Sequence, residues 1–418
     1  MMRRFANLFL VLFLADGAIS VLDELLLAVS GMHLLVQPRN VLAYLVLFLS
    51  VLVFMAMGLD RRLPKRVFLP MAAYALWGGL LFWPAPRYIP EGVFGILMAL
   101  GQLGIGLAGL RAIGHQSDHP FLMSPSMFQG PWFSAKNTLV YVSATTLAVP
   151  VLLFFMGLSA FSAFVEARTN GFMRISFTGL YMNEKTYGKN GKTLRLIPMI
   201  HIGRTAYYHD IGNSMTNGRT LILAEGVSDR QGLLRTHFSY DSLGTLLGLD
   251  TQERMTLDAT SVSDEFKPLA PTDEAAHKPH IVSADIDLSE ASPATVAFIN
   301  TLAQVLSEAD SPAGAWRGYT AWLETQTDDE SILADITYDI FTRRNQAVIS
   351  MMAKALPRYD TLIVPWGALH MADIEKEAQN MGFVLLTEKE RLSVSFREAL
   401  AHLKRIQTSE PSSPADSL

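Results

Sequence analysis

The uneven distribution of apolar residues is the feature that most constrains this chain. Half of its 418 residues are hydrophobic and only 17% are charged, which is below the usual quarter for soluble domains. The long apolar runs all lie within residues 1–165. Since a helix needs about 20 apolar residues to cross a bilayer, the pattern predicts an all-α membrane anchor in residues 1–165, followed by a soluble domain.

Five segments of the anchor are candidate spans. They cover residues 5–31, 41–59, 67–83, 92–110 and 138–164. The first also resembles the apolar core of a signal peptide, but no small-residue cleavage site follows it. We therefore predict that it is an uncleaved span and that the chain crosses the lipid bilayer five times.

Basic residues alternate between the two predicted sides of the membrane. Eight lie before the first span and in the second and fourth loops, whereas the other two loops hold only Arg39 and Arg87. Positively charged loops stay in the cytoplasm, so we expect a cytoplasmic N-terminus. Five spans then place the C-terminal domain outside the cytoplasm, in the periplasm if the protein lies in an inner membrane.

Three acidic residues, Asp16, Asp23 and Glu24, interrupt the first apolar segment. Ionisable residues inside a membrane are the usual sign of an ion or proton pathway. A position near the interface, or at the end of a short helix, accounts for them as well. We favour that structural interpretation, in which the spans act as an anchor.

Residues 166–406 alternate short apolar strands with amphipathic helices. Such alternation predicts an α/β domain with a mixed, largely parallel sheet flanked by helices. The expected strands are 172–180, 192–200, 220–224, 280–284, 360–367, 383–387 and 391–396, and the longest expected helix is 331–356. Residues 407–418 are rich in serine and proline and are predicted to be a disordered tail.

Composition and missing motifs exclude several functions. The chain has no cysteine, which rules out disulfides, thiolate nucleophiles and Cys-ligated metals. A net charge of −5 gives no support for nucleic-acid binding. The H-E-x-x-H, G-x-S-x-G and strand-linked G-x-G-x-x-G motifs are all missing from the sequence.

Four polar residues occupy equivalent places at the ends of expected strands. His201, Glu225, Asp285 and His370 each follow an apolar strand directly or within a few residues. If the strands are parallel, their carboxyl ends meet at one edge of the sheet, where ligands of α/β domains bind. Imidazoles and carboxylates gathered there bind a divalent metal or act in acid–base catalysis. Each could instead be a hydrogen-bonded structural residue, and spacing alone leaves both interpretations open.

The helix expected at 331–356 contains a further polar group, Arg344 and Asn345. On an exposed helix face these side chains would be solvated, which is their ordinary environment. Directed toward the strand ends, the guanidinium would bind an anionic group. Both alternatives remain open at this point.

Together these residues resemble the TraB/TIKI (GumN, PrgY-like) superfamily over about residues 190–396. That family carries a G-x-x-H at a strand end, a glutamate after the next strand, an Arg-Asn pair on a helix and a second G-x-x-H. The matching elements are Leu223-Ala224-Glu225-Gly226, Arg344-Asn345 and Gly367-Ala368-Leu369-His370. The first motif departs from the pattern, because Pro198-Met199-Ile200-His201 has proline in place of glycine.

The resemblance implies a membrane-tethered, metal-dependent hydrolase that acts on an extracytoplasmic substrate, with a peptide favoured over another small molecule. His201, Glu225 and His370 would bind Mn²⁺, Co²⁺ or Zn²⁺ or activate water, and Asp285 is a further candidate ligand. Arg344 and Asn345 would orient the substrate or stabilise an oxyanion. The alternative is a non-enzymatic regulatory module that binds a peptide or signal on the same fold, which Pro198 favours.

Overall fold

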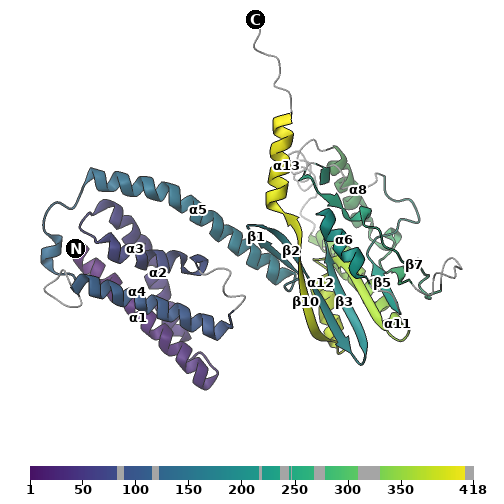
Figure 1. Ribbon diagram of the computed structural model, residues 1–418, viewed down its shortest axis with the longest axis horizontal. Coiled ribbons are helices and arrows are strands. Elements are labelled where there is room, and N and C mark those ends of the chain that lie inside the picture. The colour runs from purple at the N-terminus through teal and green to yellow at the C-terminus, as the bar shows by residue number, and fades with distance from the viewer. Residues whose placement is uncertain are drawn as a thin grey trace, which may run out of the picture. The chain divides into compact units, whose positions relative to one another are not determined.

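The computed structural model describes residues 1–81, 89–114, 122–215, 219–235, 244–245, 247–267, 278–308 and 330–409. The chain divides into two compact units, Met1–Ser159 and Ala160–Leu418. In Figure 1 the first runs from purple to blue and the second from teal to yellow. The division falls inside helix α5 (Ala135–Arg168), which also contains the boundary predicted at residue 165.

The first unit is helical. It comprises α1 (Met2–Ser30), α2 (Val36–Leu59), α3 (Lys65–Leu81), α4 (Glu91–Gly114), the 3-10 turn η2 (Pro125–Phe128) and most of α5. Among the described residues four helices, α1, α2, α4 and α5, are long and apolar enough to cross a membrane. These helices confirm the expected all-α N-terminal region, and their length and composition are those of membrane-spanning helices.

The predicted number of five spans is not reproduced. The segment expected at 67–83 forms α3, whose 17 described residues rise only about 25 Å, short of the roughly 30 Å of a bilayer core. Residues 82–88, which follow α3, lie outside the described part of the chain. The described helices therefore give four candidate spans instead of five.

The second unit contains a mixed sheet. Within the described residues its eight strands follow the order β1-β2-β3-β9-β5-β8-β7, and β10 pairs with the other edge of β2. Strands β3, β9, β5, β8 and β7 are parallel, whereas β1, β2 and β10 are antiparallel. The strands are β1 (Met173–Ser176), β2 (Gly179–Lys189), β3 (Lys192–Met199), β5 (Thr220–Ala224), β7 (Thr260–Ser261), β8 (His280–Ser283), β9 (Thr361–Gly367) and β10 (Val384–Ser395). The mixed α/β architecture expected from the sequence is confirmed.

The position of β9 determines which residues become neighbours. This late strand lies between β3 and β5, with Met199 opposite Gly367 and Ile222 opposite Ile363. The chain therefore returns to the centre of the sheet after more than 130 residues, and the segment after Gly367 lies beside the ends of β3 and β5. A small separate sheet pairs β4 (Ile202–Gly203) with β6 (Asp250–Thr251).

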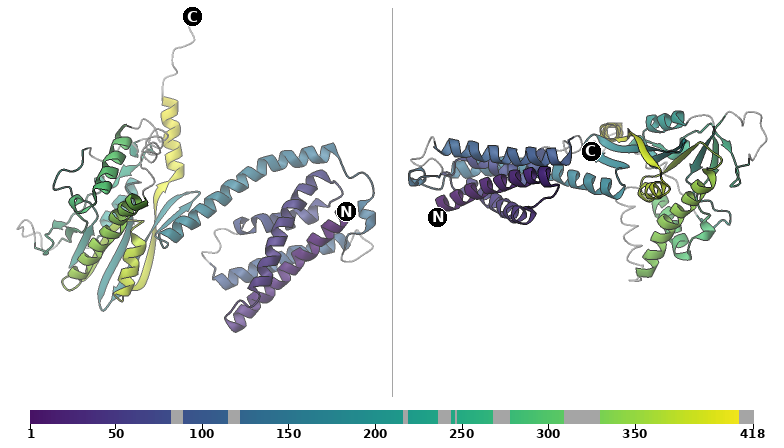
Figure 2. Two further views of the ribbon diagram at one scale, coloured as in Figure 1. Left: turned by 180° about the vertical axis from the view of Figure 1, so that it is seen from behind. Right: turned by 90° about the horizontal axis from the view of Figure 1, so that it is seen from below.

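Helices cover both faces of the sheet. They are α6 (Thr205–Ser214), α8 (Pro293–Glu308), α10 (Glu330–Thr337), a π-helical segment η6 (Tyr338–Arg343), α11 (Arg344–Ala355), α12 (Met371–Asn380) and α13 (Phe396–Ser409). Alternate residues of each strand face opposite sides. Trp366 and Leu223 pack with α11 and α12 on one face, whereas Ile363 and Ile222 pack with α6 on the other (Figure 2).

Three local predictions differ from the structure. The helix expected at 331–356 is continuous from Glu330 to Ala355, but its middle turn is π-helical, so it comprises α10, η6 and α11. The two strands expected at 383–387 and 391–396 form one strand, β10, because its pairing with β2 continues across two bulges. The disordered tail was expected from residue 407, but α13 continues to Ser409, and residues 410–418 lie outside the described part of the chain.

A buried ion pair joins α12 to β2. Lys185 of β2 donates to Glu375 of α12 at 2.9 Å, and the hydroxyl of Tyr187 donates to the same carboxylate. The side chain of Asn170, which follows α5, donates to the other carboxylate oxygen at 2.5 Å. Glu375 and Lys185 are both buried, so each charge depends on the other for its compensation.

We expect Glu375→Ala to lower the Tm of the α/β unit by roughly 10 °C, because removing one partner of a buried pair costs about 3–5 kcal/mol. Thermal unfolding of the purified full-length protein in detergent measures this. Glu390→Ala is the matched control, since the pair of Glu390 with Arg174 is exposed and should contribute about 0–1 kcal/mol. If Glu375→Ala lowered the Tm no more than Glu390→Ala does, the Glu375 pair would not be important for stability.

Candidate functional site

Four side chains from separate elements meet at the carboxyl edge of the parallel strands. Glu225 directly follows β5, and Asp285 follows β8 after one residue. His370 follows β9 and precedes the first residue of α12, while Arg344 begins α11. The edge is the one that the sequence pattern indicated, since these strands are parallel.

Arg344 lies between the two carboxylates. Its Nη2 donates to Glu225 Oε1 at 2.7 Å and to Asp285 Oδ2 at 2.7 Å, and its Nε donates to Asp285 Oδ1 at 3.0 Å. The side chains are almost enclosed, with 15% of Arg344, 8% of Glu225 and none of Asp285 exposed. Buried charges must be paired. Here the single positive charge of Arg344 compensates part of the two negative charges.

Backbone amides complete the coordination of both carboxylates. Gly367 N donates to Glu225 Oε2 at 2.6 Å, so both oxygens of that carboxylate accept a hydrogen bond. Asp285 accepts from Gly226 N at 3.0 Å and from Ile286 N at 2.9 Å. These amides compensate part of the negative charge that Arg344 leaves, because an N–H donates a charge-assisted hydrogen bond to a carboxylate oxygen.

The contacts of Asn345 determine which ring nitrogen of His370 carries a proton. Asn345 Nδ2 donates to Asp373 Oδ2 at 2.9 Å, so its oxygen faces His370 Nδ1 at 2.7 Å. An amide oxygen only accepts, and Nδ1 therefore carries the proton. The lone pair of Nε2 then points into the site, 3.4 Å from Arg344 Nη1 and 3.8 Å from Glu225 Oε1.

The electrostatic environment keeps this imidazole neutral. Burial lowers the pKa of His370, and the charge of Arg344 lowers it further, while Glu225, Asp285 and Asp373 act in the opposite direction. For Arg344, burial would lower the pKa, but Asp285 and Glu225 raise it above its ordinary value. The site thus combines a permanently charged guanidinium with an imidazole that stays neutral near neutral pH.

A π-helical segment precedes the two site residues of α11. Such segments insert one extra residue per turn and are frequent at functional sites. Here η6 ends at Arg343, immediately before Arg344 and Asn345, and its Phe341 packs against the His370 ring with centroids 5.4 Å apart. Asp339 in η6 accepts hydrogen bonds from Ser292 N at 2.7 Å and Thr295 Oγ1 at 2.8 Å, which ties the segment to the start of α8.

Trp366 forms a wall of the site that the sequence analysis did not identify. Its Nε1 donates to Leu223 O at 2.9 Å, which holds the indole across β5. The ring lies 5.5 Å from the His370 ring, nearly perpendicular to it, and 5.5 Å from the Arg344 guanidinium carbon. Asp373 was also missed, although its position three residues after His370, within the first turn of α12, was a usable signal.

His201 occupies the same sheet edge but a different environment. It follows β3, whose Met199 lies opposite Gly367, and it is exposed. Its carbonyl accepts from Gln252 N at 2.9 Å, in the turn η3 (Gln252–Arg254) after β6. The hydrogen bonds described above join Glu225, Asp285, Arg344, Asn345 and His370 to one another, whereas His201 is placed here by its exposure and by its backbone contact with η3.

Pro198, the proline in place of the family glycine, lies inside β3. It is opposite Trp366, and its carbonyl accepts a hydrogen bond from the Tyr207 hydroxyl at 2.5 Å. Within β3 no tight turn occurs at this position, because the strand continues to Met199. The family motif and the structure therefore assign different backbone roles to this position.

A divalent cation does not fit the residues as they are arranged. The oxygens of Glu225 and Asp285 accept hydrogen bonds from Arg344, and Glu225 also accepts one from the Gly367 amide. The guanidinium occupies the space between the two carboxylates where a cation would bind. Across the part of the chain that the structure describes, no group of three His, Asp or Glu residues could hold a metal ion.

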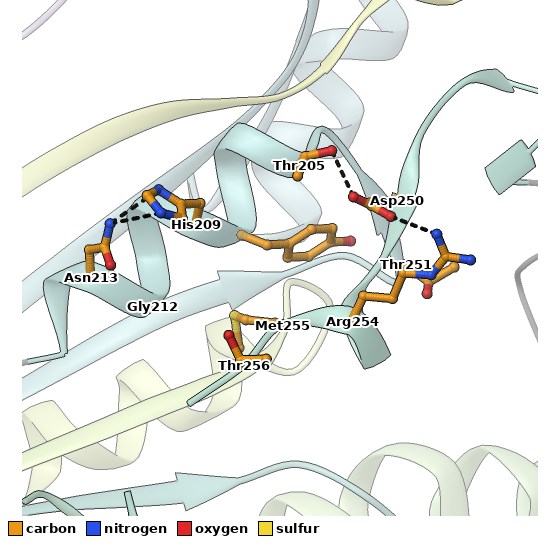
Figure 3. Close-up of a pocket in the computed structure, with 10 residues that line it drawn as sticks. Thr205, His209, Gly212, Asn213, Asp250, Thr251, Arg254, Met255 and Thr256 are labelled. Carbon is orange, nitrogen blue, oxygen red and sulfur yellow. Dashed lines mark hydrogen bonds and ion pairs between the residues drawn. The ribbon is translucent and has the colours of Figure 1, made fainter. Parts of the chain in front are cut away.

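A cavity of about 240 Å³ lies away from this network, between α6 and the segment that follows β6 (Figure 3). Asp250 accepts from Thr205 Oγ1 at 2.7 Å and from Arg254 Nη1 at 3.1 Å on its rim, and His209 contacts Asn213. None of the predicted site residues lines it. The predicted site lies elsewhere, and its charged side chains are largely buried.

Comparison of the chain with protein families, curated proteins and solved structures finds no match. The resemblance to the TraB/TIKI superfamily therefore stays a prediction from the short elements around Glu225, Arg344 and His370.

We expect Arg344→Ala to destabilise the α/β unit by about 3–5 kcal/mol, because it leaves the buried carboxylates of Glu225 and Asp285 facing each other. Arg344→Lys should recover only part of this loss, since an ammonium cannot reproduce the forked contacts of the guanidinium. Unfolding of the full-length protein in detergent measures both. Lys354→Ala, an exposed change on the same helix, is the control; a loss no larger than the control would contradict the proposed dependence.

Proposed function

We propose that this chain is a membrane-bound hydrolase whose α/β domain uses His370 to activate water. The observation that supports the proposal is the fixed, neutral imidazole, with its Nε2 lone pair beside a buried guanidinium. A neutral imidazole is the usual general base near neutral pH. The chain Asp373–Asn345–His370 orients this base in the way that a carboxylate orients the histidine of a catalytic triad.

The proposed reaction is attack of water on a carbonyl carbon. His370 Nε2 accepts a proton from the water while the water oxygen bonds to the carbon, and the carbonyl oxygen takes the negative charge. Arg344 Nη1, whose contact with Nε2 is long at 3.4 Å, is the donor available to that oxyanion. Glu225 Oε1, 3.8 Å from Nε2, stabilises the imidazolium, which then protonates the leaving group.

We further propose a peptide substrate outside the cytoplasm. This location rests on the alternation of basic loops and requires an odd number of crossings, one more than the four described helices that are long enough to span. Hydrolysis of peptides is the activity that the family resemblance implies. Metal dependence is the other implied property, and the donor set described above argues against it.

An alternative function is non-enzymatic binding of a peptide or signal. The observation that favours it is the burial of the network. Even its most exposed charged side chain, that of Arg344, is only 15% exposed. A closed, fully paired network is suited to holding strands together, and a ligand would then bind elsewhere on the domain. The two functions differ in whether a bond in the bound peptide is broken.

Hydrolysis by the full-length protein in detergent, followed by mass spectrometry of a peptide library, tests the proposal. His370→Ala should lower kcat by about 10²–10⁴-fold, because it removes the general base, whereas His209→Ala, an exposed histidine of the same unit, should leave it unchanged. Activity should persist in EDTA. Activity lost in EDTA and restored by Zn²⁺ would support the metal-dependent version, and peptide binding without cleavage would support the binding module.

The pH profile of kcat/KM provides a second test. Because the pKa of His370 is lowered, the base stays unprotonated, and activity should fall only below the ordinary histidine value of about 6.5. The charge of Asp373 acts to raise the pKa of His370. Asp373→Asn should therefore move the acid limb to still lower pH, in addition to reducing kcat. An acid limb above the ordinary value, or one that Asp373→Asn leaves in place, would exclude His370 as the base.

A further inference from the structure

A stripe of buried polar residues runs along α1 in the membrane unit. Asp16, Ser20, Asp23 and Glu24 are separated by four, three and one residues, which places them on one face of a helix. None is more than 7% exposed. A buried polar stripe in a helix that is apolar enough to cross a membrane needs a specific explanation, because such residues are expensive there.

At one end of the stripe, the acidic residues have partners. Asp23 accepts from Arg39 at 3.2 Å, from the Leu35 amide at 2.8 Å, and lies 2.8 Å from His33 Nδ1. Glu24 accepts from Arg39 at 2.9 Å. These contacts come from the turn between α1 and α2 and from the start of α2, so the structural interpretation, a position near the helix end, fits these two residues.

Asp16 differs, because it lies near the middle of the 29-residue helix. Its Oδ2 accepts from Gln102 of α4 at 2.8 Å, whereas its Oδ1 is buried with no hydrogen-bond partner among the described residues. Arg39 is the cation that acts on Asp16, and it already binds Asp23 and Glu24. One oxygen of a buried carboxyl group is therefore left for a ligand.

Close helix packing limits what that ligand is. A methyl group on Gly17 would lie 3.1 Å from the backbone nitrogen of Leu103 in α4, so the two helices touch at this level. A metal ion needs several oxygen ligands, but Gln102 presents an N–H to Asp16 and to the Phe13 carbonyl. A proton needs only the free oxygen.

We propose that Asp16 is a proton-binding site inside the membrane unit. Binding converts the carboxylate to a neutral acid at Oδ1 and removes the large free energy of a buried, uncompensated charge. Ser20, Asp23 and Glu24 continue the same polar face of α1 toward its C-terminal end, with Asp23 about 10 Å from Asp16 along the helix.

Carbodiimide labelling tests the site, because dicyclohexylcarbodiimide modifies protonated carboxyl groups in apolar surroundings. The full-length protein in lipid nanodiscs is treated from mildly acidic to alkaline pH, and the modified residue is identified by mass spectrometry. We expect Asp16 to be labelled, less so as pH rises, and labelling to be lost in Asp16→Asn. Asp60 is the internal control, since it is equally buried but paired with Arg62 at 2.7 Å, and it should not react.

Infrared spectra of the unmodified protein test the same site without a variant, which could fail to fold. A carboxylic-acid C=O band that disappears on alkaline titration supports the proposal. Absence of both the band and the label would overturn it, as would equal labelling of Asp16 and Asp60. Protection of Asp16 by Na⁺ at constant pH would also overturn it, in favour of a cation site.

Discussion

The guanidinium of Arg344 compensates two carboxylates that are buried at the carboxyl ends of β5 and β8. Without a cation between them, Glu225 and Asp285 would be like charges in a low-dielectric environment, which destabilises a folded domain strongly. The pairing also holds three elements in register, since Arg344 belongs to α11 and the carboxylates follow two strands. Trp366 and Gly367 contribute from β9, so the central strand of the sheet is part of the same contact set.

The same contacts determine the chemical character of the site. Arg344 keeps its charge, and that charge, with burial, keeps His370 neutral. Helix α12 then connects this chemistry to the rest of the sheet, because it carries Asp373, which orients the His370 relay through Asn345, and two residues later Glu375, which pairs with Lys185 of β2. The geometry of the site and the stability of the domain consequently depend on one short helix.

The two units treat buried acidic groups in different ways. In the α/β unit, Glu225 and Asp285 accept hydrogen bonds on both oxygens, from Arg344 and from backbone amides. In the membrane unit, Asp16 has one partnered oxygen and one without a partner among the described residues. Burial costs the same free energy in both places unless the charge is compensated or removed. Pairing compensates it in the first unit, and protonation is the available solution in the second.

Local patterns in the sequence determined the membrane helices, the apolar strands and the position of Glu225, Asp285 and His370 at strand ends, because each depends on residues within a few positions. They could not determine that β9 lies between β3 and β5, or that the His201 side chain is exposed. Nor did they show that Arg344, 119 residues from Glu225, pairs with the site's own carboxylates. These features depend on strand order and on a π-helical segment, and tertiary packing decides both because short-range periodicity contains no information about partners so distant in the chain.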